Sequence, residues 1–342
     1  MSSGAHHVII GSGSAGFGAA LTLREGDADC RISLVTMDSL PFYNRFDLPQ
    51  IFRGMTEWRE MLAAPPAFYD ENKITLRRHN RVVNVEGQTR CLRLSHQESV
   101  SFDTLLVCSG GRGYVPENLI DKLPLMHGFA SFEAMMQLYR DLPKGGHAIM
   151  IGGDMVGIDL ALTLVDTGYR VTLIETPQTF WPHEVVGDER RKLIEALANA
   201  GLEIAPPSRP VAVREGASNG ARRAVRLADK SEIAGDVVIP SCGLLPSVEF
   251  MLNAGVDIER GILVNPELGS TNPAIWAAGD VCQIWHDREK AYKFYHGWGN
   301  VRRMGELAAR NMLGAHEIFD VDVEDRIGVD ASGNITSSFW TQ

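Results

Sequence analysis

Residues 7–18 read HVIIGSGSAGFG, and this stretch decides the fold. The apolar run at 7–10 predicts a buried strand, and the glycines after it open a helix-forming stretch. Their GxGxxG spacing is typical of a loop that binds a dinucleotide. In such a loop Gly11 makes the tight turn, Gly13 lets the backbone approach a pyrophosphate, and Gly16 lets the helix pack closely on the strand.

The helix predicted after this loop begins at Ser14 and Ala15, so its N-terminus would face the phosphate charge. A second strand at 32–36 returns the chain to the place where an acidic residue binds the ribose of a dinucleotide. The sequence has Met37 there, followed by Asp38. We expect Asp38 to contact the ribose; the alternative is a solvated turn carboxylate.

The same pattern returns at 147–157, which read HAIMIGGDMVG. Gly152 and Gly157 keep the outer glycines of the loop, and a helical pattern and a further strand follow. Asp154 stands at the position of the middle glycine, where its side chain and negative charge would meet a pyrophosphate. We therefore expect this second site to bind its ligand more loosely than a full glycine loop would.

Glu175 ends the strand of the second unit. A carboxylate at this place accepts from both hydroxyls of an adenine ribose and repels a 2'-phosphate, which favours NADH over NADPH. The alternative is an ordinary surface carboxylate at a strand end.

Composition narrows the class of protein. A chain of 342 residues is long enough for two domains. Its net charge of -10 argues against nucleic-acid binding. No apolar run is long enough for a membrane span or a signal peptide, so we expect a cytoplasmic protein. The five cysteines form no CxxC pair, which predicts neither a local redox disulfide nor a metal site.

Two further stretches resemble fingerprints of a known family, the FAD/NAD-linked reductases of the pyridine nucleotide-disulfide oxidoreductases. Residues 102–111 (FDTLLVCSGG) resemble its second FAD fingerprint, with Ser109 and Gly110. Residues 271–281 (TNPAIWAAGDV) resemble its third, in which Gly279 and Asp280 would contact FAD. The resemblance covers about residues 5–313. It implies an α/β fold of two Rossmann-like, three-layer β/β/α domains, the second inserted in the first, with FAD and NAD(H) as cofactors.

The segment HGWGN at 296–300 opens a helix that, in similar proteins, points its N-terminus at the flavin. The resemblance makes Gly297 and Trp298 cofactor-binding residues, although an aromatic here could be core packing alone. His296 could assist proton delivery, or it could be a helix cap or a packed polar residue.

Residues 40–49 (LPFYNRFDLP) resemble the rubredoxin, ferredoxin and nitrite reductase branch of the family, which lacks the redox-active cysteine pair. The resemblance adds Arg45 and Val83 to the cofactor-binding residues. Gln50 stands where relatives often carry a lysine near the flavin, and Asp159 stands where they carry its glutamate partner. We expect a lower flavin potential or altered hydride geometry from this change.

The domain map expected from these units has an FAD-binding domain at 1–113 and 236–313, with an NAD(P)H-binding domain at 114–235. A short C-terminal tail at 314–342 would be a truncated interface domain, with enough strand-like sequence at 318–323 and 335–339 for a hairpin. The flavin edge would then be open or covered by a partner subunit. We favour the partner, since Phe339 and Trp340 would otherwise be exposed.

The function that the resemblance implies is that of a flavoprotein oxidoreductase in electron transfer, passing hydride from NADH to FAD and electrons to a small redox protein of the ferredoxin or rubredoxin type. Two alternatives remain. One is a flavoprotein subunit of a larger complex with a weak nicotinamide site. The other is direct reduction of a small molecule, a quinone or oxygen. A homo- or hetero-oligomer is compatible with all three.

Overall fold

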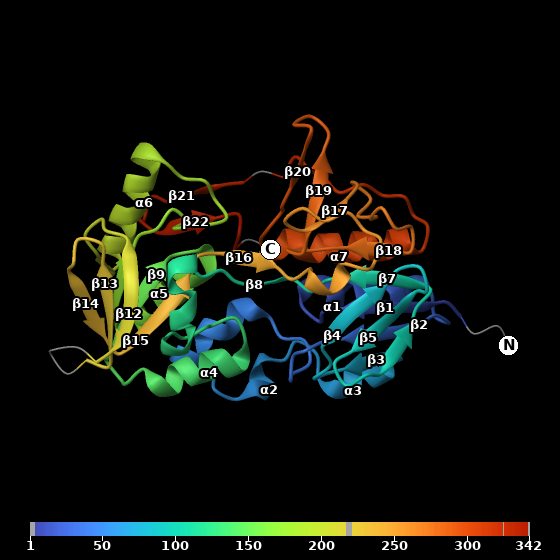
Figure 1. The fold of residues 1–342 in the computed structure, drawn as a ribbon, viewed down its shortest axis with the longest axis horizontal. Helices are drawn as coiled ribbons and strands as arrows, with labels where there is room; N and C mark the ends of the chain where they lie inside the picture. Colours follow the sequence, from blue (N-terminus) through green and yellow to red (C-terminus); the bar gives the residue numbers. More distant parts are fainter. Residues whose placement is uncertain (1–3, 217–220, 324, 341–342) are drawn as a thin grey trace.

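The computed structural model describes residues 4–216, 221–323 and 325–340. The chain forms two α/β lobes that meet in the middle of the molecule (Figure 1). Among the described residues, no helix is long and apolar enough to cross a membrane.

The first lobe is built on a five-stranded parallel sheet in the order β18-β7-β1-β2-β3. Its strands are apolar and mostly buried, as expected for a parallel sheet that is covered on both faces. The strands are β1 (His6–Ile10), β2 (Arg31–Val35), β3 (Ile74–Arg77), β7 (Thr104–Val107) and β18 (Ile275–Ala277).

Helices and antiparallel strands form the other layers of this lobe. Helices α1 (Ser14–Gly26) and α7 (Trp298–Met312) pack on each other. The antiparallel strands are β4 (Val82–Glu86), β5 (Cys91–Leu94) and β6 (Ser99–Ser101) in one sheet, and β17 (Ile262–Val264), β19 (Cys282–His286) and β20 (Ala291–Lys293) in another. One apolar core joins the layers, with Ile9, Leu23, Leu92 and Ala308 fully buried in it.

The second lobe repeats the plan with a four-stranded parallel sheet in the order β11-β10-β9-β15. Its strands are β9 (His147–Gly152), β10 (Arg170–Ile174), β11 (Glu203–Ile204) and β15 (Val237–Ser241). The helices are α4 (Phe132–Asp141), α5 (Met155–Asp166) and α6 (Gly187–Asn199), and a three-stranded antiparallel sheet contains β12 (Pro210–Glu215), β13 (Arg223–Leu227) and β14 (Glu232–Gly235). The two Rossmann-like units predicted from the sequence are thus both present.

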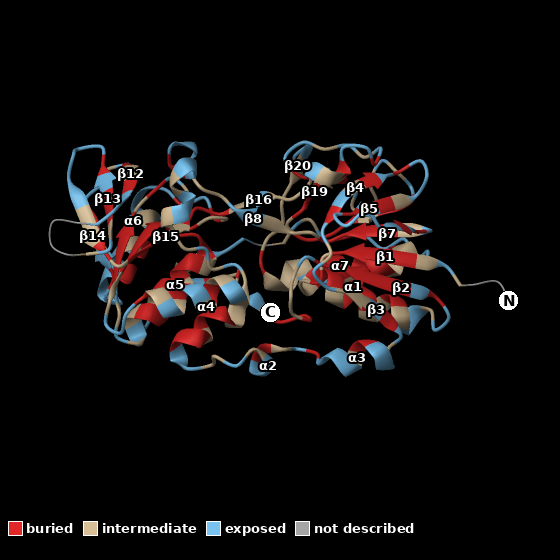
Figure 2. Ribbon diagram, turned by 60° about the horizontal axis from the view of Figure 1, so that its bottom comes forward, coloured by how far each residue is buried: buried red, intermediate tan, exposed pale blue. Residues whose placement is uncertain are grey.

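One strand departs from the predicted domain map. The map returns the chain to the first domain at residue 236, but Val237–Ser241 pairs in parallel with β9 and therefore lies in the second sheet. The chain crosses between the lobes just after it, where β16 (Leu244–Pro246) pairs with β8 (Gly111–Gly113) (Figures 1 and 2). We place the domain boundary at this ribbon.

Short helices connect the main elements. They are η1 (Arg45–Arg53), α2 (Trp58–Met61), α3 (Pro66–Glu71), η2 (Glu117–Leu125) and η3 (Glu249–Met251). Helix η1 comes from the first lobe but packs on α4 and α5 of the second. It therefore brings side chains of residues 45–53 to the junction of the lobes.

The C-terminal tail does form a hairpin, of β21 (Ile327–Val329) and β22 (Ile335–Ser337). The first strand lies later in the chain than the predicted 318–323, which is not a strand. The hairpin packs on α6 of the second lobe. His183 holds it there, with Nε2 2.7 Å from Ser337 Oγ and an ion-pair contact to Asp325.

The reason given for a partner subunit, that the final aromatics would otherwise be exposed, is wrong, while the partner itself stays a prediction. Phe339 is 7% exposed, and its ring packs edge-on against Phe46 with centroids 5.6 Å apart. Trp340 is partly buried and donates from Nε1 to the Met155 carbonyl at 3.0 Å. The chain therefore covers both rings itself.

Candidate dinucleotide sites

The first glycine loop has the geometry that its spacing predicts. Gly11 has φ +100°, and a Cβ there would lie 2.1 Å from the Cys108 carbonyl oxygen. A Cβ on Gly16 would lie 1.9 Å from the Gly11 carbonyl oxygen. Since both obstacles are backbone atoms that cannot move aside, only glycine fits at these two positions.

Gly13 is different, because a Cβ there would meet only Arg45 Nη1, at 3.3 Å. Gly13 is also the N-cap of α1, and it has no side chain with which to accept from the first N–H groups of the helix. These N–H groups, which include those of Ser14 and Ala15, lie at the start of α1, and the guanidinium of Arg45 borders the space that a Cβ would fill. The loop therefore fits a pyrophosphate, for which an uncapped helix N-terminus and an arginine are suitable partners.

Asp38 is not the solvated turn carboxylate of the alternative interpretation. Its side chain is 10% exposed and pairs with Arg45 Nη2 at 2.9 Å. Tyr43 donates to the same carboxylate oxygen at 3.3 Å, and burial raises the pKa of Tyr43 to about 12. Asp38 thus holds Arg45 beside the loop, and its contact with a ribose remains a prediction.

Thr36 is the residue that sequence reasoning missed in this unit. The pairing of β1 with β2 and of β9 with β10 has the same register, so Thr36 follows β2 as Glu175 follows β10. Thr36 is buried and its hydroxyl accepts from the Asp38 N–H at 3.1 Å. An alignment of the two units on their first glycines would instead pair Glu175 with Leu34, because the first unit is two residues longer before its second strand, so only the strand register reveals Thr36.

The third fingerprint and the start of α7 lie together. Asp280 Oδ1 is 2.7 Å from His296 Nδ1, and His296 stacks on Phe294 with centroids 5.4 Å apart. Gly297, with φ +95°, is the N-cap of α7 and offers no capping side chain. The indole N–H of Trp298 is buried and has no acceptor within the described ranges. An uncapped helix and an orphaned donor fit a polar ligand at this place.

The remaining candidates of the first unit are placed as follows. The Ser109 hydroxyl donates to the Ser247 carbonyl at 2.9 Å, and nothing lies within 4 Å of a Cβ on Gly110. A Cβ on Gly279 would lie 3.0 Å from Val301 of α7. Val83 lies in β4 with 41% of its surface exposed, so its cofactor contact stays a prediction.

Gln50 and Asp159 lie on η1 and α5, the two elements that pack together across the junction. No hydrogen bond joins them in the part of the chain that the structure describes. Burial raises the pKa of Asp159, while the charge of Arg53 lowers it and that of Asp47 raises it. Asp47 and Arg53, which sequence reasoning did not single out, are thus the charged neighbours of Asp159.

The second glycine loop is already capped by the chain itself. Asp154 is the N-cap of α5, and its Oδ1 accepts from the Gly157 N–H at 2.8 Å. Its Oδ2 accepts from the Gly243 N–H, also at 2.8 Å, and the side chain is buried. Burial raises the pKa of this carboxyl. The N-terminus of α5 is therefore capped by the Asp154 carboxylate, whereas the N-terminus of α1 has no side-chain cap.

We expect Asp154→Gly to tighten NADH binding and to weaken the fold. Removing the side chain clears the loop and should lower the KM for NADH about tenfold, equivalent to about 1.4 kcal/mol. The buried Gly243 N–H loses its acceptor, which should cost about 1–3 kcal/mol of stability. Steady-state kinetics and chemical unfolding measure the two effects. Asp154→Asn, which keeps the bulk but not the charge, is the control; an unchanged KM in both variants would contradict the expectation.

Glu175 lies at the end of β10, beside the second loop, and is partly exposed. Its Oε2 is 3.2 Å from Arg190 Nε. The other guanidinium nitrogens of Arg190 donate to the Thr176 and Thr179 carbonyls, at 3.0 and 3.3 Å. An arginine therefore stands beside the carboxylate that we expect to bind the ribose. Its position was not predicted, because it comes from the first turn of α6.

The C-terminal residues Phe339 and Trp340 lie at the junction of the two lobes, near the starts of α7 and α5. Phe339 lies against the start of α7, where its carbonyl accepts from the Trp298 N–H at 3.3 Å. Trp340 bonds to Met155, the first residue of α5. On the other side Trp181 contacts His296, with centroids 4.5 Å apart. Aromatic side chains from three separate segments thus line the place where the lobes meet.

Comparison with known proteins gives a consistent result. The family model described as pyridine nucleotide-disulphide oxidoreductase matches residues 5–301. The nitric oxide reductase FlRd-NAD(+) reductase of Vibrio vulnificus (strain CMCP6) is 28% identical over 278 residues, 81% of this chain and 72% of that protein. The ferredoxin--NAD(+) reductase component of the anthranilate 1,2-dioxygenase system of Burkholderia cepacia is 27% identical over 317 residues, 91% of this chain and 76% of that protein.

Among solved structures, the covalent putidaredoxin reductase-putidaredoxin complex is similar with a TM-score of 0.83 and 20% sequence identity. The match covers 95% of this chain and 78% of that one. At this identity the likeness establishes the fold.

Proposed function

The chain belongs to the pyridine nucleotide-disulphide oxidoreductase family, and from this premise we propose that it is an FAD-dependent enzyme that oxidises NADH and passes electrons to a small redox protein. The relatives named above are NAD(+) reductases, one of them for a ferredoxin. The observation that carries the proposal is that the chain has two different dinucleotide units. The loop before α1 has no side-chain cap and lies beside Arg45, which suits FAD, whereas the second unit has Glu175 after its second strand, which suits NADH.

In this proposal the first lobe binds FAD. The N–H groups of α1 and the Arg45 guanidinium hold the pyrophosphate, and Asp38 orients Arg45. Asp280, held by His296, contacts the sugar chain. The N-terminus of α7, which has no side-chain cap, would face the flavin, where its dipole would stabilise negative charge.

The second lobe binds NADH, with Glu175 accepting from the adenine ribose. FAD, when bound, supplies the chemistry, since it accepts hydride and releases electrons singly. The residues of the chain position the two dinucleotides, and the aromatic rings at the junction exclude water. His296 is the titratable side chain beside the junction that could hold a proton, with Asp280 fixing its orientation.

Anaerobic mixing with NADH tests the function. Purified protein reconstituted with FAD should lose its yellow colour within seconds, and a ferredoxin or rubredoxin should restore it. Failure of every concentration of NADH or NADPH to reduce the flavin would contradict the proposal. Peroxide production as fast as NADH consumption would instead favour oxygen or a small molecule as the acceptor.

The second candidate function is that of a flavoprotein subunit with a weak nicotinamide site. The cap formed by Asp154 favours it, because a carboxylate occupies the helix terminus that a pyrophosphate would use. In that case dithionite, but not NADH, would bleach the flavin.

We expect Gln50→Lys to raise the midpoint potential of the flavin. A lysine at position 50 of η1, which packs on α5, would place a positive charge at the junction. The expected rise is about 30 mV, which corresponds to about 1.4 kcal/mol for a two-electron couple. Redox titration measures it. Gln137→Lys, on the exposed face of α4, is the control, and equal midpoints for wild type and Gln50→Lys would count against this role.

A further inference from the structure

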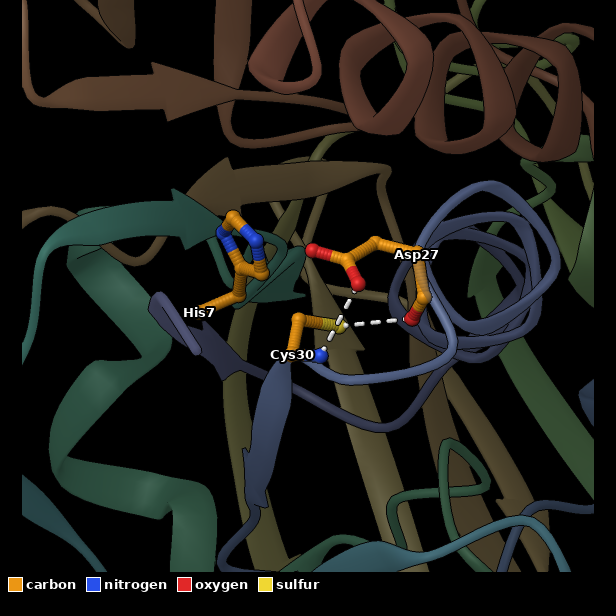
Figure 3. Close-up of side chains that lie close together, drawn as sticks. All are labelled: His7, Asp27 and Cys30. Atoms are coloured by element: carbon orange, nitrogen blue, oxygen red, sulfur yellow. Dashed lines mark hydrogen bonds between the residues drawn. The ribbon is translucent and has the colours of Figure 1, made fainter. Parts of the chain in front are cut away.

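Three side chains with metal-binding atoms meet at the end of the first sheet that lies away from the glycine loop (Figure 3). His7 is near the start of β1, Asp27 is the C-cap of α1, and Cys30 comes directly before β2. One ligand atom from each, a ring nitrogen, a carboxylate oxygen and a thiol sulfur, lies within 4.8 Å of the other two.

His7 is prepared as a neutral ligand. It is 3% exposed, and its Nδ1 lies 2.6 Å from the Thr104 hydroxyl oxygen. In the tautomer whose Nδ1–H donates to Thr104, Nε2 carries the lone pair, which is the arrangement in which histidine binds metals. Nε2 is buried, and none of the described residues forms a hydrogen bond with it. A buried ring nitrogen without a partner calls for a ligand.

Asp27 offers a second free acceptor. Its Oδ1 accepts from the N–H groups of Asp29 at 2.8 Å and Cys30 at 3.1 Å, which fixes the carboxylate. The other oxygen points toward the His7 ring (Figure 3). Two acceptors that face each other across a buried space repel unless a proton or a cation lies between them.

Cys30 completes the set and has a charged neighbour. It is 4% exposed, and its Sγ lies 3.7 Å from Arg24 Nη1. The guanidinium of Arg24 is anchored on the carbonyls of Asp27, Ala28 and Cys30. It favours the thiolate that a metal requires, although its charge also weakens the attraction for a cation. A metal bound here displaces the thiol proton of Cys30.

We propose that His7 Nε2, Asp27 Oδ2 and Cys30 Sγ bind one divalent transition metal ion of the zinc class. Nitrogen, oxygen and sulfur donors together suit Zn²⁺ or Co²⁺, whereas Mg²⁺ and Ca²⁺ take oxygen ligands. Ligand atoms of a tetrahedral zinc site lie about 3.3–3.8 Å apart, so the three side chains close around the ion by small rotations, and a water takes the fourth position.

The site escapes sequence analysis, since its ligands come from a strand start, a helix end and a loop rather than from a CxxC spacing. A metal there ties the end of α1 to the starts of β1 and β2. It lies at the opposite end of β1 from Gly11, and its presence is independent of the proposed reaction.

Cobalt titration of the metal-free, FAD-loaded protein tests the site. We expect one equivalent of Co²⁺ per chain, with the long-wavelength absorption of tetrahedral cobalt, where oxidised flavin does not absorb. Zn²⁺ should displace it, and competition with a chromophoric chelator gives the affinity. Zinc should also raise the unfolding temperature as its concentration increases.

Cys30→Ser and His7→Gln should each weaken zinc binding about 100-fold or more, consistent with loss of one of three ligands. Cys91→Ser, a cysteine of β5 outside the cluster, is the matched control and should bind as the wild type does. Unfolding temperatures without metal show that each variant is folded, and Asp27→Asn replaces any variant that is not. Absence of cobalt bands in the wild type, or equal zinc binding by wild type and Cys30→Ser, would overturn the proposal.

Discussion

Gly13→Val is expected to give a protein that folds but binds FAD at least about 100-fold more weakly than the wild type, a loss of about 2.7 kcal/mol. Gly13 has φ -73° and ψ -170°, a conformation that valine adopts readily. In the protein alone, a Cβ at this position meets only the flexible end of Arg45. In the proposed complex with FAD, it would occupy the place of the pyrophosphate. Flavin content after gel filtration and flavin titration measure the loss.

Two other glycines serve as controls for this experiment. Gly18→Ala lies in the same helix, and its Cβ would meet Glu306 Cγ at 3.3 Å, so FAD should be retained. Gly11→Ala should instead destabilise the fold, because its Cβ would overlap the Cys108 carbonyl. A Gly13→Val protein that is as yellow as the wild type would place the pyrophosphate elsewhere.

Glu175→Ala is expected to shift the coenzyme preference from NADH toward NADPH by about 100-fold in the ratio of kcat/KM, or about 2.7 kcal/mol. The carboxylate that repels a 2'-phosphate is removed. Arg190 keeps its bonds to the Thr176 and Thr179 carbonyls and stays in place with its partner gone. A guanidinium held in this way binds phosphate well.

Two further variants test whether the shift comes from the Arg190 guanidinium or only from the loss of one negative charge. Glu189→Ala removes an exposed carboxylate of the same α6 turn and should leave the preference unchanged. The double variant Glu175→Ala/Arg190→Ala should lose the gain for NADPH. Equal NADPH kinetics in the single and the double variant would show that Arg190 does not contact the phosphate.

The two βαβ units could be predicted from the sequence because each is local. Strand, loop, helix and strand lie within about 30 residues, and the glycine positions are set by backbone clashes that the spacing encodes. The steric roles expected of Gly11 and Gly16 follow from such clashes. Strand β15 was misplaced because its partner, β9, is 89 residues earlier at the register Val238 to Ile149 and no local signal marks the pairing.

The site could be predicted only in part, since several of its features depend on distant contacts. Asp154 was recognised as unusual, but its role as a cap needs the Gly243 N–H, far along the chain. The ion pair of Glu175 and Arg190 could not be predicted, because it forms only where α6 packs beside the end of β10. The orphaned nitrogen of His7 needs Thr104, which reaches it through the pairing of β1 with β7.

The position of Trp340 bears on how the protein is handled. Its indole bonds to the first residue of α5, and Phe339 lies against the start of α7. An affinity tag or fusion partner joined after Gln342 would therefore start only two residues from the junction of the lobes and could displace both rings. The described chain begins in the first lobe with β1, at the edge away from the junction (Figure 1), so a tag at the N-terminal end is the better choice for kinetic work.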